Sequence, residues 1–186
     1  MSHKPLIKFI FEMAQLRRIK HEGLRFAGVD HPLSVADHAL RSAQIAFFLA
    51  KMEKYENPYE VVTMMVFHDI GECRIGDIHK VASRYIKADE EGAVRDQVRP
   101  LEDGDEILSL WRQCDKRTSV PGVIAKDADY LEKAFTAKEY LETGHMTTDD
   151  WIQTVKKHLQ TKSAKTLLAE MVKMRSTDWW DGLKKI

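Results

Sequence analysis

Apolar residues recur at helical spacing through most of this sequence, and this periodicity restricts its fold more than any other feature. Segments 5–19 and 121–141 each carry an apolar stripe, which in the second includes Ile124, Ala128 and Leu131. An apolar residue at every third or fourth position marks one face of an α-helix. No stretch shows the apolar-polar alternation of a strand, and no repeat or low-complexity tract is present. The sequence therefore predicts an all-α protein.

Capping residues indicate where further helices begin. Ser34 and Asp37 have the three-residue spacing of a capping box, with Asp in place of Glu or Gln. Asn57 is a favourable N-cap and Pro58 suits a first helical position, so a third helix is expected from there to Gly71. Other helices are expected at about 34–55, at 101–115, from 147 onward and at 163–174.

Length and charge limit the class of protein. The 186 residues suit one ordinary domain, and 44% hydrophobic with 31% charged residues is typical of a soluble globular protein. The 29 basic residues equal the 29 acidic ones, so the formal net charge is zero. A zero balance argues against a nucleic-acid polymer as partner. It leaves room for a local basic pocket that binds a small anion.

The cysteines and the apolar runs bear on location. Cys73 and Cys114 are the only cysteines and lack the spacing of a metal motif, which favours a reduced compartment. The N-terminal stretch has no small-residue cleavage site and is expected to be a helix. No apolar run approaches the ~20 residues that a membrane-spanning helix needs. We expect a cytoplasmic protein that does not enter a membrane.

The apolar stretch "VVTMMVFHDIG" at 61–71 ends in two ionisable residues, His68 and Asp69. Burying such groups costs roughly several kcal/mol per unpaired charge unless something binds them. Imidazole and carboxylate groups commonly bind divalent cations, and His38 on the first turn of another apolar helix could join them. Glu72 follows within one helical turn, so it emerges on the same side, where it can act as a base or orient water.

A later helical aspartate would complete such a metal site, and the stretch "AKDADYLEKA" contains two. Asp127 lies near the edge of the apolar stripe, and Asp129 lies two residues further on. Either could be an ordinary exposed residue, and the periodicity leaves both open.

The spacing of His38, the His68-Asp69 pair and Asp129 resembles that of the HD-domain superfamily of metal-dependent phosphohydrolases. The phrases "SVADH", "FHDIGECRIGDI", "KDADYLEKAFTAKEY" and "DWW" are similar to its 5′-deoxynucleotidase-like branch. The resemblance extends from about Arg17 to Trp180. It implies a helical bundle that forms a homodimer.

The same resemblance implies a domain layout. Residues 1–186 would form a single HD domain, with a metal-binding core at about 17–142 and C-terminal helices at about 147–180. It also implies four metal ligands, which are His38, His68, Asp69 and Asp129. Asp129 is thereby selected over Asp127.

Substrate contacts follow from the resemblance as well. It makes Glu72 the candidate for activating water and Asp77 the residue that touches the substrate sugar. The family commonly has Trp where Leu24 stands, and some nucleotidases have Arg where Gly23 stands. Arg18, in the nearby basic stretch, is a candidate for binding the phosphate.

The resulting prediction is a metal-dependent phosphohydrolase, with a 5′-nucleotidase acting on (deoxy)nucleoside monophosphates as the first choice. The cofactor is one divalent cation, and mixed nitrogen and oxygen ligands suit Mn, Co, Ni, Fe or Zn, and Mg less well. Two alternatives stay open. One is another HD phosphohydrolase that acts on a nucleotide triphosphate or a phosphodiester. The other is a regulatory protein that binds metal with little catalysis.

Overall fold

A computed structural model describes residues 2–183 of the chain. Within this range the chain is helical or irregular, and an isolated bridge between Lys20 and Ser34 is its one β-type pairing. The predicted all-α fold is therefore confirmed. Position 1 and positions 184–186, which belong to the predicted domain, lie outside the described residues.

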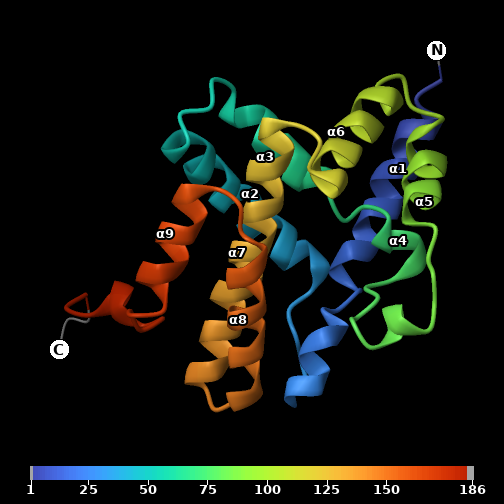
Figure 1. Cartoon of the computed structure of the whole chain (residues 1–186). Helices are drawn as coiled ribbons and strands as arrows, with labels where there is room; N and C mark the ends of the chain where they lie inside the picture. Colours follow the sequence, from blue (N-terminus) through green and yellow to red (C-terminus); the bar gives the residue numbers. More distant parts are fainter. Residues whose placement is uncertain (1, 184–186) are drawn as a thin grey trace.

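The helices follow one another along the chain and are labelled in Figure 1. The α-helices are α1 (Lys4–Met13), α2 (Val35–Met52), α3 (Pro58–Phe67), α4 (Glu72–Ile75), α5 (Glu90–Val98), α6 (Gly104–Lys116), α7 (Val120–Glu142), α8 (Asp149–His158) and α9 (Lys162–Met171). The 3₁₀-helices are η1 (Ala14–Arg17), η2 (Glu22–Ala27), η3 (Ala82–Arg84), η4 (Met146–Thr148) and η5 (Asp178–Trp180).

Helix α7 is the central element of the bundle (Figure 1). It packs against α2, α3, α6 and α8, and α2 also packs closely against α3. The predicted stripe on α7 forms this contact, because Ile124, Ala128 and Leu131 are buried. Leu49 of α2 and Met64 of α3 meet them in the same core. Burial of this apolar area is the main force that holds the bundle together.

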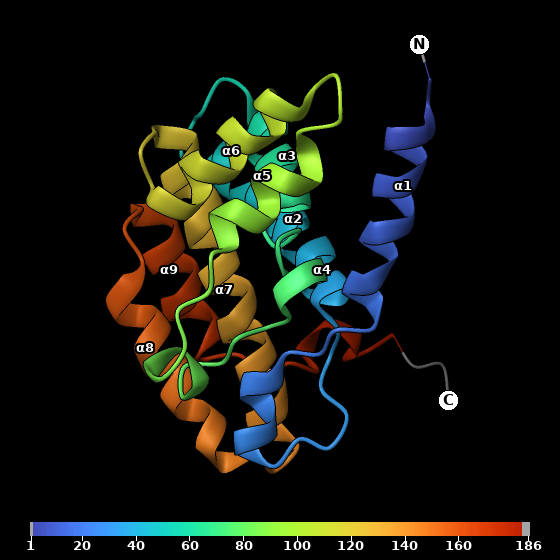
Figure 2. The same ribbon diagram turned by 90° about the vertical axis from the view of Figure 1, so that its right-hand side faces the viewer.

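A second, smaller core joins α1, α5 and α6. Phe9 of α1 packs with Val94 and Val98 of α5 and with Trp111 of α6. Figure 2 shows α1 along one side of the molecule, away from α8 and α9. Helix α5 was not predicted, because its sequence is mostly charged. Asp89 caps it by accepting a hydrogen bond from the backbone N–H of Gly92, at 2.9 Å.

The predicted helix starts at Ser34 and Asn57 are confirmed, whereas the helix predicted from 101 begins at Gly104. The Ser34 side chain accepts from the N–H of Asp37, and the Asp37 carboxylate accepts from the N–H of Ser34, which completes the capping box. Asn57 accepts from the N–H of Glu60 at 3.4 Å. The first helix is shorter than predicted, because it ends at Met13 and continues as the 3₁₀-helix η1. No described helix is both long and apolar enough to cross a membrane.

Candidate metal centre

His38 of α2 meets His68 and Asp69, from the turn after α3, in the interior of the bundle. His38 Nε2 lies 3.2 Å from His68 Nε2, and Asp69 Oδ2 lies 2.9 Å from the same His68 atom. One ligand atom from each of the three residues lies within 4.8 Å of the others. Two nitrogens bound to one cation at about 2.1 Å each are separated by about 3 Å, so this spacing suits shared coordination.

The turn after α3 sets the direction of His68. The prediction that this helix ends at Gly71 was wrong, since α3 ends at Phe67 and residues 68–71 form turns before α4. His68 Nδ1 donates to the carbonyl of Met65 at 2.7 Å, and the indole N–H of Trp111 donates to the carbonyl of His68 at 2.8 Å. With the proton on Nδ1, Nε2 carries the lone pair that a cation needs.

A carboxylate at the back of His38 orients the other imidazole. Nδ1 of His38 donates to Glu132, and both residues are buried. The Glu132 carboxylate also accepts from Arg41 Nε at 3.0 Å and from Thr136 Oγ1 at 2.7 Å. This arrangement fixes the tautomer and turns His38 Nε2 toward the other two ligands. The sequence offered one clue to Glu132, which is its position one turn after Asp129 on α7.

Of the two candidate aspartates, Asp129 is the one that lies beside the histidines. Its Oδ1 is 3.0 Å from His38 Nε2 and 3.8 Å from His68 Nε2. Its carboxylate also forms ion pairs with Lys126 and Lys133, at 3.0 and 2.7 Å. Asp129 is not part of the three-residue group within 4.8 Å.

Asp127 has a structural partner elsewhere. Its buried carboxylate accepts hydrogen bonds from the backbone N–H groups of Gln160 and Thr161, at 3.0 and 2.7 Å. These bonds fix the connection between α8 and α9. Asp127 therefore stabilises the position of the C-terminal helices.

Glu72 begins α4 beside the group of possible ligands. Its Oε2 is buried and has no hydrogen-bond partner among the described residues. Burial, together with the nearby carboxylates of Asp69 and Asp77, raises the pKa of this carboxyl to about 9. A buried polar atom without a partner is costly, so this oxygen is placed to meet a water or another ligand.

Asp77 lies on the other side of Glu72 and is held by the chain itself. It follows Gly76, whose φ of 74° is readily adopted only by glycine. Asp77 Oδ2 accepts from the backbone N–H of Glu22 at 2.7 Å, which orients the carboxylate. Burial raises the pKa of Asp77.

The electrostatics of this region suit a cation. Burial lowers the pKa of His38, but hydrogen bonds to Asp129 and Glu132 raise it by more, to about 10. The surrounding carboxylates thus attract positive charge strongly enough to hold a proton on a buried imidazole. Two imidazoles with carboxylate oxygens match the ligand preference of borderline divalent metals. These residues therefore fit the divalent cation that the sequence predicts.

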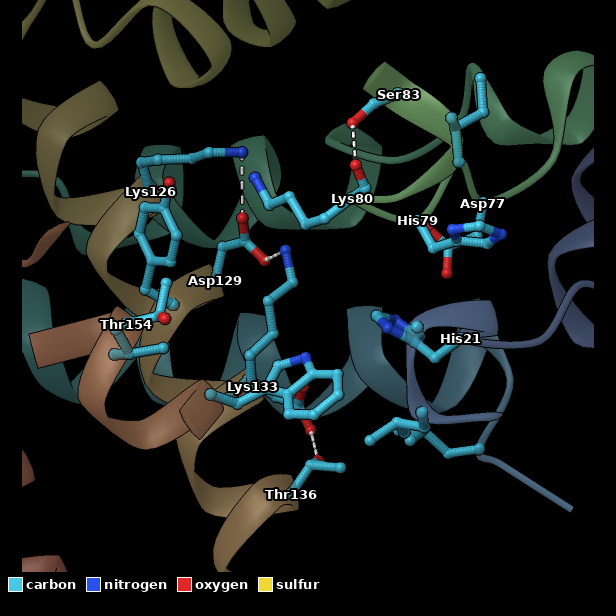
Figure 3. Close-up of a pocket in the computed structure, with 18 residues that line it drawn as sticks. His21, Asp77, His79, Lys80, Ser83, Lys126, Asp129, Lys133, Thr136 and Thr154 are labelled. Atoms are coloured by element: carbon cyan, nitrogen blue, oxygen red, sulfur yellow. Dashed lines mark hydrogen bonds and ion pairs between the residues drawn. The ribbon is translucent and has the colours of Figure 1, made fainter. Parts of the chain in front are cut away.

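A cavity of about 310 Å³ opens next to Asp129 (Figure 3). Its size suits a small organic ligand. The lining residues with polar, charged or aromatic side chains are His21, Asp77, His79, Lys80, Ser83, Lys126, Asp129, Tyr130, Glu132, Lys133, Thr136, Trp151 and Thr154.

The cavity wall differs in part from the sequence prediction. Gly23 and Leu24 line it, so the positions where family members carry Arg and Trp face this cavity. Arg18 is not among the lining residues; it is exposed and its guanidinium lies 3.5 Å from the carbonyl of Ala14. Lys126 and Lys133 were missed, because charged residues on a helix usually face solvent.

Comparisons with known proteins agree with this arrangement. A family model described as "HD domain" matches residues 13–171. A curated relative from Bos taurus, named 5'-deoxynucleotidase HDDC2, is 29% identical over 140 residues, which are 73% of this chain and 67% of the relative.

Solved structures share the fold over nearly the whole chain. A crystal structure from a genomics project is 31% identical, with a TM-score of 0.79 over 95% of this chain and 98% of its own. A predicted metal-dependent phosphohydrolase from Magnetospirillum magnetotacticum is 21% identical, with a TM-score of 0.66 over 91% and 92% of the two chains, and supports the fold alone. The residues of the candidate metal centre lie within residues 13–171, which the HD-domain model matches.

Proposed function

The chain belongs to the HD domain family, and on this premise we propose that it is a metal-dependent 5′-nucleotidase that releases phosphate from (deoxy)nucleoside monophosphates. One observation carries the proposal: a group of residues suited to a cation lies beside Asp129, which lines a cavity that also presents Lys80, Lys126 and Lys133. A phosphate ester needs both features. The cation stabilises charge on the phosphoryl group, and the cavity holds the remainder of the molecule. The curated relatives named 5'-deoxynucleotidase support this choice of substrate.

The proposed ligands of the cation are His38, His68, Asp69 and Asp129. When bound, a divalent cation supplies a positive centre that lowers the pKa of water and polarises the phosphoryl oxygens. The buried hydrogen bonds of His38 and His68 engage Nδ1 of each imidazole and leave Nε2 in the orientation that binding requires.

Glu72 is the proposed general base. Its free Oε2 accepts a proton from the attacking water as the new P–O bond forms and the ester P–O bond breaks. The nucleoside oxygen then takes up a proton and leaves, so the products are a nucleoside and inorganic phosphate. A cation nearby lowers the pKa of Glu72 and favours the carboxylate that this role needs.

The proposed substrate contacts lie in the same cavity. Asp77, fixed by the N–H of Glu22, accepts a hydrogen bond from a sugar hydroxyl. Leu24 and Gly23 offer neither an aromatic plane nor a guanidinium, but Trp151 and Tyr130 line the cavity and present ring surface. Stacking on an aromatic ring tolerates every base, so weak discrimination among bases is expected.

A substrate panel tests the proposal. Metal-stripped protein is reloaded with Mn²⁺ or Co²⁺ and incubated with nucleoside monophosphates, nucleoside triphosphates and cyclic phosphodiesters. Phosphate release from monophosphates is expected. Turnover confined to triphosphates or phosphodiesters would point to a different HD phosphohydrolase. Full metal binding without turnover of any substrate would point to a regulatory protein.

The proposal extends to domain layout, location and oligomeric state. Residues 1–186 form one HD domain with a metal-binding core at about 17–142. The protein acts in the cytoplasm and forms a homodimer. Light scattering of the purified protein tests the last point. A mass of twice the chain mass of 21.5 kDa is expected, and a monomer at micromolar concentration would contradict it.

A further inference from the structure

Two lysines of α7 converge on the aspartate beside the candidate metal centre. Lys126 and Lys133 lie one turn before and one turn after Asp129, so all three side chains emerge on one face of the helix. Figure 3 shows both ammonium groups directed at the Asp129 carboxylate from the cavity wall. Their side chains are only 23% and 34% exposed, so this is a built arrangement of the cavity rather than a solvated surface pair.

The two lysines differ in the oxygen that they contact. Lys126 Nζ lies 3.0 Å from Oδ2, whereas Lys133 Nζ lies 2.7 Å from Oδ1. Oδ1 is also the atom 3.0 Å from His38 Nε2, so it faces the candidate ligands. Lys133 therefore holds the oxygen that a cation at His38 and His68 would use.

A cation and the Lys133 ammonium group cannot share this oxygen without strong repulsion. A divalent cation bound to Asp129 would compete with both ammonium groups for this carboxylate and would leave Lys126 and Lys133 without their acidic partner. A phosphate monoester carries close to two negative charges at neutral pH and can pair with the two released ammonium groups. Both lysines line the cavity on flexible four-carbon stems, so they can turn from Asp129 to an anion there.

We propose that Lys133, assisted by Lys126, binds the phosphoryl group of the substrate, and that it exchanges Asp129 for this group when the cation binds. The inference rests on the proposed function for the identity of the substrate. Lys133 of α7 would then supply the positive charge for the phosphate that Gly23, which replaces an Arg of some nucleotidases, does not offer. Cation and phosphate then promote each other's binding, because the cation displaces the Lys133 ammonium group from Asp129 and the phosphate binds the displaced group. Linkage requires the two effects to be equal in size.

Binding measurements without turnover test this exchange. Mn²⁺ is titrated calorimetrically into metal-stripped protein, with and without inorganic phosphate. In the wild type, phosphate should tighten Mn²⁺ binding about 5-fold or more, the lower end of typical coupling between sites. In Lys133→Met, Mn²⁺ should bind more tightly than in wild type when phosphate is absent, and added phosphate should change it less than about 2-fold, well below such coupling.

Three further variants serve as controls. Lys138→Met is the matched control, because Lys138 lies on the same helix but pairs with Glu142 at 3.0 Å; it should behave as the wild type. Lys133→Arg keeps the charge and should keep the coupling, and Lys133→Gln replaces Lys133→Met if that variant does not fold. Wild-type coupling in Lys133→Met, or in Lys133→Gln where it takes its place, would overturn the proposal, and so would weaker Mn²⁺ binding in that variant without phosphate.

The outcome separates this inference from the proposed function. Coupling that depends on Lys133, in a protein that hydrolyses no nucleotide, would support the exchange and reject the nucleotidase. Hydrolysis of monophosphates with wild-type coupling in the Lys133 variants would support the nucleotidase and reject the exchange.

Discussion

The buried imidazole of His38 donates its Nδ1 proton to the buried carboxylate of Glu132, a residue 94 positions later in the sequence. This bond ties α2 to α7 and leaves His38 Nε2 facing His68 and Asp129. The candidate metal centre thus depends on Glu132, which contacts the imidazole of His38 and is not among the proposed ligands.

Replacing Glu132 should weaken cation binding without removing a ligand. Glu132→Gln loses the charged partner of His38, and such outer contacts typically contribute about 10–100-fold to metal affinity. Competition with a chromophoric chelator measures the affinity. Glu139→Gln is the control, since Glu139 also accepts from Arg41 but does not contact His38. Equal affinities in the two variants would show that Glu132 does not position the imidazole.

The two aspartates of α7 should separate metal binding from stability. Asp129→Ala should abolish the bound metal. Asp127→Ala should keep the metal but lower the free energy of unfolding by about 1–3 kcal/mol, because the partly buried hydrogen bonds from the N–H groups of Gln160 and Thr161 are lost. Elemental analysis and chemical denaturation measure the two effects. Full metal occupancy in Asp129→Ala would remove Asp129 from the ligand set.

Glu72 should make the metal-free protein less stable at higher pH. Its folded-state pKa of about 9 exceeds the ordinary value of about 4.3, so between these values the folded protein binds a proton that the unfolded chain does not. Stability from this group is complete below about pH 4.3 and is lost as pH rises through about 9, by at most about 1.4 kcal/mol per pH unit.

The variant Glu72→Gln removes this titration. In denaturant unfolding at pH 5 to 8, it should gain stability relative to the metal-free wild type as pH rises. Stability curves that stay parallel over this range would show that Glu72 is ionised in the folded protein at neutral pH.

Asp77 should determine the preference for one sugar, while the base has little influence. A site built to bind a hydroxyl group loses about 1–3 kcal/mol when its partner is missing. Turnover of ribo- and deoxyribonucleoside monophosphates with every base, in wild type and Asp77→Ala, measures both preferences. An unchanged sugar preference in the variant would exclude Asp77 from the substrate site. Sharp selection of one base by the wild type would contradict the weak discrimination among bases that is expected with Leu24 in place of Trp.

The sequence was most informative where local chemistry decides structure. Capping by Ser34 and Asn57 is a local interaction, so the start of α2 and of α3 could be predicted. The end of α3 could not, because it depends on a hydrogen bond from Trp111, which lies 43 residues away. Periodicity left Asp127 and Asp129 undecided for the same reason, since both are buried and only their distant partners differ.

The charged residues of α7 show the same limit. A sequence pattern treats Glu132 and Lys133 as solvated helix residues, because most charged residues are exposed. In the structure Glu132 is buried behind His38, and Lys133 lines the cavity. These assignments come from the packing of α2 against α7, which no local pattern encodes.

We propose that a single bound cation makes this protein a phosphohydrolase. A titration of phosphate release against bound metal tests this. Metal-stripped protein is reloaded stepwise with Mn²⁺, and phosphate release from a deoxynucleoside monophosphate is measured at each step alongside elemental analysis. Turnover should start near zero and rise in proportion to bound metal up to one ion per chain. Glu72→Gln should bind the same amount of metal yet turn over roughly 10²–10⁴-fold more slowly. Substantial phosphate release by the metal-stripped protein, or none at full occupancy, would contradict the account.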